Sequence, residues 1–137
     1  MQPFRLPERP WILVVDDNAV TRKILFLVLR RMGYDADVAA DGVEALEALE
    51  ERSYDAILMD LAMPRLDGYE TTEIIRQCET DTQTPIVAIT ASTGQEDRDR
   101  CFDLGMNGFL TKPIDRAQLA AILRELIGPG IRRRMTG

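Results

Sequence analysis

The pattern that most constrains the fold of this chain is an alternation of short apolar runs with longer stretches of helical periodicity. Short apolar runs bounded by turn residues are typical of strands, and repeated strand–helix units are typical of a parallel sheet. Because strand–helix–strand crossovers are right-handed, such a chain forms a doubly wound α/β sandwich of three layers. The sequence predicts strands over residues 11–15, 34–40, 55–60, 86–90 and 107–110, and helices over residues 19–32, 42–51, 69–78, 95–104 and 115–127.

The two ends of the chain fall outside this repeated pattern. Residues 1–10 contain three prolines and no periodic element, so we expect an extended arm there. Residues 129–137 contain three consecutive arginines after a helix-terminating Gly-Pro-Gly, and we expect a basic tail. Between them, residues 11–128 fit a single domain that is large enough to bury a core.

Two of the predicted elements differ in how deeply we expect them to be buried. The run over residues 34–40 alternates aspartates with small apolar residues, which is typical of a strand at the edge of a sheet. The helix over residues 19–32 carries one apolar stripe, which we expect to face the core. That stripe consists of Ile24, Leu25, Val28, Leu29 and Met32.

Four of the apolar runs end at groups suited to phosphate and metal chemistry. They lead into Asp16-Asp17, Asp60, Thr90 and Lys112. In a doubly wound sheet, ligands bind outside the carboxyl ends of the strands. Three carboxylates, a hydroxyl and one ammonium would therefore meet at one edge of the sheet, and this combination favours a divalent cation and a phosphoryl group.

Each group has a specific chemical use in such a site. Asp16 and Asp17 would repel each other and Asp60 unless a cation neutralised them, and Mg²⁺ prefers such oxygen ligands. The Asp60 carboxylate could attack phosphorus to form an acyl phosphate. Lys112 and Thr90 could compensate and bind the phosphoryl oxygens. Taken singly, each residue fits an ordinary turn, helix cap or strand, so the inference depends on all of them occurring together.

Composition narrows the classes of partner. The net charge is −6 and the pI is about 4.7, which argues against generic binding to nucleic acid or to an anionic membrane surface. No apolar stretch is long enough to span a bilayer. Cys78 and Cys101 lack metal-site spacing, so we expect free thiols in a reducing compartment such as the cytoplasm. The chain contains no histidine, so any phosphohistidine must belong to a partner.

Four motifs together resemble the receiver domain of two-component response regulators. They are Val14-Val15-Asp16-Asp17-Asn18, Met59-Asp60-Leu61-Ala62-Met63-Pro64 with Asp67-Gly68, Ile89-Thr90-Ala91, and Thr111-Lys112-Pro113. The resemblance covers roughly residues 10–128. It implies a flavodoxin-like (βα)5 fold with strand order 2-1-3-4-5.

The resemblance also implies a role for each site residue. Asp60 would accept the phosphoryl group, and Thr90 and Lys112 would bind it. Asp16, Asp17, Asp60 and the backbone carbonyl of Ala62 would hold Mg²⁺, with Mn²⁺ as a substitute. Phe109 matches the aromatic residue that switches position together with Thr90, and the Lys112–Pro113 peptide bond would be cis.

The implied function is a phosphorelay receiver and not an enzyme that turns over a separate substrate. The donor would be a sensor histidine kinase or a histidine phosphotransfer protein. A downstream protein would read the surface over residues 95–127. The motifs fit both a stand-alone regulator and the receiver of a hybrid histidine kinase, and the sequence leaves this choice open.

Two other functions compete with this interpretation. A haloacid-dehalogenase-like phosphohydrolase also uses an aspartate nucleophile with Mg²⁺, but it requires Asp-x-Asp after the first strand and a cap insertion. Here the order is Asp16-Asp17-Asn18, and no segment is long enough for a substantial cap. A docking module that is never phosphorylated is disfavoured because every expected site residue is present.

Overall fold

The computed structural model describes residues 9–130, and within them it contains five strands and five helices in strict alternation. The ends of the predicted elements shift by at most one residue. The strands are β1 (Trp11–Val15), β2 (Asp35–Ala39), β3 (Ala56–Asp60), β4 (Ile86–Thr90) and β5 (Gly108–Thr111). The helices are α1 (Ala19–Met32), α2 (Gly42–Glu51), α3 (Gly68–Cys78), α4 (Gln95–Asp103) and α5 (Arg116–Ile127).

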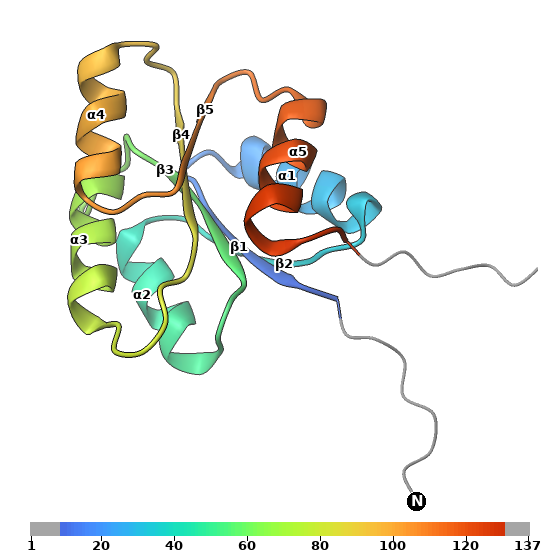
Figure 1. The fold of residues 1–137 in the computed structure, drawn as a ribbon, viewed down its shortest axis with the longest axis horizontal. Coiled ribbons are helices and arrows are strands. Elements are labelled where there is room, and N and C mark those ends of the chain that lie inside the picture. Colours follow the sequence, from blue (N-terminus) through green and yellow to red (C-terminus); the bar gives the residue numbers. More distant parts are fainter. Residues whose placement is uncertain (1–8, 131–137) are drawn as a thin grey trace, which may run out of the picture.

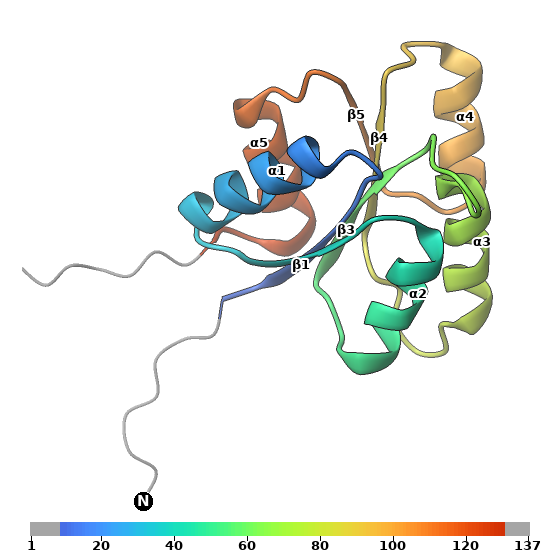
Figure 2. The same ribbon diagram turned by 180° about the vertical axis from the view of Figure 1, so that it is seen from behind.

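All five strands are parallel and lie in the order β2-β1-β3-β4-β5, which confirms the predicted topology. Helices α1 and α5 cover one face of the sheet, and α2, α3 and α4 cover the other (Figures 1 and 2). The strand order reverses between β1 and β3, so the carboxyl ends of these two central strands border the crevice where such folds bind ligands.

Burial of the central strands on both faces explains why they read as continuous apolar runs. In β1, Ile12 and Val14 join the core beneath α1 and α5, whereas Leu13 and Val15 join the core beneath the other three helices. Strand β2 lies at the edge as predicted, and its Val38 is 45% exposed. Side chains of successive residues point to opposite faces, so each central strand contributes to both cores.

Capping residues at the starts of α1 and α3 position the loops around the carboxyl edge of the sheet. Asn18 caps α1 by accepting hydrogen bonds from the N–H groups of Val20 and Thr21. Asp67 caps α3 through a capping box with Glu70. Gly68 follows directly, and a Cβ atom there would lie 2.3 Å from the carbonyl oxygen of Asp60. Only glycine therefore lets α3 begin this close to the end of β3.

The structure corrects one prediction about α1. Ile24, expected on the buried stripe, is 51% exposed, while Leu25, Val28 and Leu29 are buried. The buried arc of α1 is wide enough for the successive residues Val28 and Leu29, but Ile24 falls beyond its edge. Val20 (66% exposed) and Leu27 (51% exposed) flank Ile24, so α1 carries a second apolar stripe toward solvent.

The predicted arm over residues 1–10 and basic tail over residues 129–137 lie almost entirely outside the described residues and stay predictions. Within residues 9–130, no helix combines the length and the apolar character that crossing a membrane requires. Cys78 is exposed and Cys101 is buried, and both thiols are free as expected.

Candidate functional site

The carboxyl ends of β1 and β3 place three carboxylates together. Oxygen atoms of Asp16, Asp17 and Asp60 all lie within 4.8 Å of one another. Asp16 is fully buried, Asp60 is 3% exposed and Asp17 is exposed. The two strands pair in parallel with Val15 opposite Met59, so the residues that follow them meet at the same edge. This is the juxtaposition that the sequence predicted.

Backbone contacts fix the orientation of the two buried carboxylates. Asp16 Oδ1 accepts a hydrogen bond of 2.9 Å from the N–H of Asn18. Asp60 Oδ1 accepts one of 3.2 Å from the N–H of Ala62. Arg22 on α1 donates to the carbonyl oxygen of Asp16 at 2.8 Å and so ties the loop to the helix. Sequence reasoning missed Arg22, because an arginine on the first turns of a helix usually faces solvent.

Lys112, which follows β5, supplies the positive arm of the site. Its Nζ lies 2.9 Å from Asp16 Oδ2 and 3.4 Å from Asp60 Oδ2. The peptide bond from Lys112 to Pro113 is cis, as the resemblance implied. One ammonium thus faces three carboxylates, and the site keeps an excess of negative charge.

This charge imbalance shifts the pKa values of Asp60 and Lys112. Burial and the neighbouring charge of Asp16 raise the pKa of Asp60 to about 6, although Lys112 and the N–H of Ala62 counteract part of the increase. Burial lowers the pKa of Lys112, but its contacts with Asp16 and Asp60 outweigh this effect and leave the pKa above its ordinary value. Lys112 therefore stays charged near neutral pH, whereas the Asp60 carboxyl is partly protonated near pH 6.

The donor set fits a hard divalent cation. Asp16 Oδ2 is buried and has no hydrogen-bond partner among the described residues, because its contact with Lys112 is an ion pair without hydrogen-bond geometry. Lys112 compensates part of the charge on this oxygen, but one ammonium cannot neutralise the carboxylates of Asp16, Asp17 and Asp60 together. Clustered carboxylate oxygens are the ligands that Mg²⁺ takes in proteins. The acidic cluster therefore fits Mg²⁺.

Thr90 lies at the end of β4 and joins the site through the backbone. The N–H of Lys112 donates to the carbonyl oxygen of Thr90 at 2.8 Å. The Thr90 side chain is buried, and its Oγ1 accepts a hydrogen bond of 3.0 Å from the N–H of Ser92. The structure thus places Thr90 on the strand next to the one that ends at Asp60, and it shows no hydrogen bond between the two side chains.

Phe109 on β5 is half-buried against the core beneath α2, α3 and α4. The Arg98 guanidinium of α4 lies 5.3 Å from the centre of its ring, within the range of a cation–π contact. A ring that is neither fully buried nor free in solvent is compatible with a side chain that changes position. Its switching role stays a prediction.

Comparison with protein families assigns the chain. The model described as the response regulator receiver domain matches residues 12–124. The chain therefore belongs to the response regulator receiver domain family and is a receiver domain of phosphorelay signalling. This assignment decides against the phosphohydrolase alternative.

Individual relatives agree with this assignment. Hybrid signal transduction histidine kinase B of Dictyostelium discoideum is 43% identical in an alignment 119 residues long, and the match covers 79% of this chain and 6% of that protein. The receiver domain of sensor histidine kinase PA1611 from Pseudomonas aeruginosa, solved with a magnesium ion in its active-site cleft, is 44% identical with a TM-score of 0.79, covering 87% of this chain and 98% of that one.

A third relative was solved together with a partner. The receiver domain of the response regulator Ssk1 from Saccharomyces cerevisiae, in complex with the histidine phosphotransfer protein Ypd1, is 30% identical with a TM-score of 0.79. The match covers 88% of this chain and 92% of that one. The magnesium ion was found in the structure of one relative and the phosphotransfer protein in the structure of another.

The raised pKa of Asp60 predicts a pH-dependent cost to the metal-free fold. Its pKa is about 6 in the folded chain against an ordinary 3.8, so the folded state holds this proton more tightly and loses stability as the pH rises between these values. The full loss is about 3 kcal/mol. Asp60→Asn should remove it and make the metal-free protein more stable than wild type near neutral pH.

Urea unfolding in the presence of a chelator, from about pH 4 to about pH 8, measures this difference. Asp81→Asn is the matched control, because Asp81 is exposed in the loop before β4 and lies away from the carboxyl edge. Wild type and Asp60→Asn with the same pH slope would contradict the account of Asp60.

Proposed function

We propose that this chain accepts a phosphoryl group on Asp60 from a phosphohistidine of a partner protein. The observation that carries this proposal is the meeting of Asp60 with Asp16 and Asp17 within 4.8 Å and with Lys112 at 3.4 Å. Asp16, Asp17, Asp60 and the backbone carbonyl of Ala62 would hold Mg²⁺, and Mn²⁺ could replace it as another hard divalent ion.

Transfer of the phosphoryl group from the phosphohistidine to Asp60 needs no further reactant. A carboxylate oxygen of Asp60 attacks phosphorus, the phosphorus–nitrogen bond of the phosphohistidine breaks, and the imidazole leaves with that electron pair. The bound ion would neutralise charge on the phosphoryl oxygens. Lys112 stays charged and lies close enough to share this task, and Thr90 can donate its hydroxyl hydrogen. The chain would thus promote its own modification and would not turn over a separate substrate.

The partner must supply the histidine, because this chain contains none. A histidine phosphotransfer protein or a sensor histidine kinase fits this requirement, and the similar Ssk1 receiver was solved with such a phosphotransfer protein.

Two free thiols fit action in the cytoplasm. Relatives that are hybrid histidine kinases support a receiver within a larger kinase, and the same site would also serve a stand-alone regulator.

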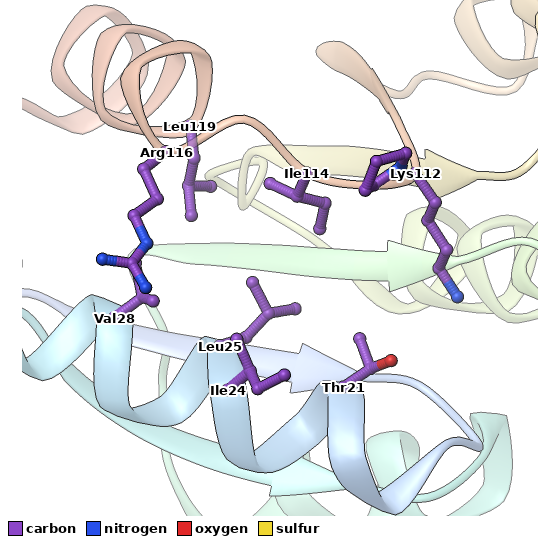
Figure 3. Close-up of a pocket in the computed structure, with 9 residues that line it drawn as sticks. Thr21, Ile24, Leu25, Val28, Lys112, Ile114, Arg116 and Leu119 are labelled. Atoms are coloured by element: carbon purple, nitrogen blue, oxygen red, sulfur yellow. The ribbon is translucent and has the colours of Figure 1, made fainter.

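A groove beside the site offers the donor a place to dock. A cavity of about 300 Å³ lies between α1 and the segment from Lys112 to α5. Figure 3 shows Leu25 and Thr21 of α1 facing Ile114, with Lys112 at one end of the groove. Because Lys112 belongs to both the groove and the acidic site, a donor seated there reaches the carboxyl edge directly. The exposed Ile24 extends this apolar surface.

We propose a different surface for the downstream partner. Thr90 and Phe109 would change position when Asp60 is phosphorylated, and the surface over residues 95–127 would change with them. Within this range, helix α4 follows Thr90 after the loop over residues 91–94, and Phe109 is part of strand β5. A local change in charge would then bias a two-state surface.

Phosphorylation by a small donor tests the acceptor. Wild type incubated with Mg²⁺ and acetyl phosphate should gain one phosphoryl mass by intact mass spectrometry. Asp60→Asn should gain none, because an amide oxygen is a poor nucleophile, and a chelator should abolish the gain in wild type. Asp81→Asn, altered in an exposed loop, should behave as wild type. A phosphoryl mass that persists in Asp60→Asn would overturn the acceptor assignment.

A charged substitution in the groove separates docking from chemistry. Ile24→Glu should slow phosphorylation by a phosphotransfer protein that modifies wild type, since it places a charge on an apolar docking surface. Its rate with acetyl phosphate should not change. Phe102→Glu is the control, because Phe102 is a similarly exposed apolar residue on α4. Equal rates for the two variants with the protein donor would contradict docking at this groove.

A further inference from the structure

One side-chain pair joins the loop after β4 to helix α4. The N–H of Ser92 donates to Thr90 Oγ1 at 3.0 Å, and Ser92 Oγ donates to Asp97 Oδ2 at 2.5 Å. Ser92 Oγ also accepts from the N–H of Gly94 at 3.2 Å. The residue that holds the Thr90 hydroxyl is therefore held in turn by a carboxylate of α4.

Asp97 makes a second contact, with the neighbouring helix. The Tyr69 hydroxyl of α3 donates to Asp97 Oδ1 at 3.4 Å. Arg100 lies 3.9 Å from the centre of the Tyr69 ring, so the same turn of α4 covers the ring as well. Helices α3 and α4 lie side by side on one face of the sheet in both views (Figures 1 and 2). Asp97 thus bridges the loop that carries Thr90 and helix α3.

Helix α4 has few other anchors. Of its nine residues, only Cys101 is buried. Its N-cap residue is Gly94, which has no side chain to cap the first turn. A nine-residue helix with little buried surface depends on tertiary contacts to stay formed. Asp97 is therefore one of the few side chains of α4 that tie its first turns to the rest of the structure.

We propose that Asp97 is a positioning residue that holds Thr90 through Ser92 and couples the position of Thr90 to the stability of helix α4. The coupling rests on the proposed function, in which Thr90 binds the phosphoryl group. In the unphosphorylated chain, Ser92 N–H occupies one acceptor site of Thr90 Oγ1 and leaves the hydroxyl hydrogen free to donate. When Thr90 moves toward the phosphoryl group, Ser92 moves with it and its hydrogen bond to Asp97 lengthens.

A second aspartate of the same helix provides a matched control. Asp99 accepts a hydrogen bond from the Gln95 side chain within α4 and makes none to the loop or to α3. Replacing either aspartate by alanine raises the intrinsic helix propensity by a similar amount. Asp97 differs in also lying in the first turn, where its negative charge stabilises the positive end of the helix. A difference between Asp97→Ala and Asp99→Ala therefore reports the contacts of Asp97 together with this charge effect, and Ser92→Ala isolates the contact because it leaves the charge of α4 unchanged.

Amide hydrogen exchange over residues 98–103, measured by NMR on the metal-free full chain, tests whether Asp97 holds α4. Loss of one hydrogen bond to a charged group should speed exchange about tenfold in Asp97→Ala. Ser92→Ala should have a similar effect without altering helix charge, and Ser92→Thr, which keeps the hydroxyl, should restore wild-type rates. Equal exchange in Asp97→Ala and Asp99→Ala would overturn the proposal.

The same exchange measured with beryllofluoride and Mg²⁺ tests the coupling. In wild type and Asp99→Ala, exchange over residues 98–103 should rise toward the rates of Asp97→Ala, whereas Asp97→Ala should show little further change. Unchanged exchange in wild type that binds beryllofluoride, as seen by fluorine NMR, would overturn the coupling. If wild type binds no beryllofluoride, the proposed function fails and the coupling with it, while the metal-free comparison still decides whether Asp97 holds α4.

Discussion

The chemistry of the site depends on the crowding of buried carboxylates against a single ammonium at one edge of the sheet. Asp16 and Asp60 are almost fully buried and lie near Asp17. Among the described side chains, Lys112 is the only cation that forms an ion pair with their carboxylate oxygens. Such an arrangement costs stability in the folded chain unless a metal ion or a proton compensates it. The fold tolerates this cost because its two cores are extensive, and the cost is what makes the site receptive to Mg²⁺.

The residues of the site could be predicted because parallel topology places them independently of their own contacts. The carboxyl ends of parallel strands meet at one edge, so Asp16, Asp60, Thr90 and Lys112 follow from the order of the elements alone. The edge position of β2 could likewise be predicted from its alternating aspartates. Strand order came with the family resemblance, since the alternation of elements is compatible with more than one order.

Other features could not be predicted because they depend on loop conformation or on small differences in helix orientation. Ile24 and Leu25 are neighbours of similar hydropathy, and only the packing of α1 against the sheet and α5 decides which of them is buried. The pair of Ser92 and Asp97 arises from the path of the loop after β4. Tyr69 is distant in sequence from Asp97, and no periodic pattern links the two.

The number of protons released when Mg²⁺ binds tests this electrostatic account most directly. Titration calorimetry near pH 6, in buffers of different ionisation enthalpy, measures that number. Because the pKa of Asp60 is about 6, wild type should release about half a proton there and almost none near pH 8, and Asp60→Asn should release much less than wild type near pH 6. Mg²⁺ binding without proton release near pH 6, or with undiminished release in Asp60→Asn, would contradict the account.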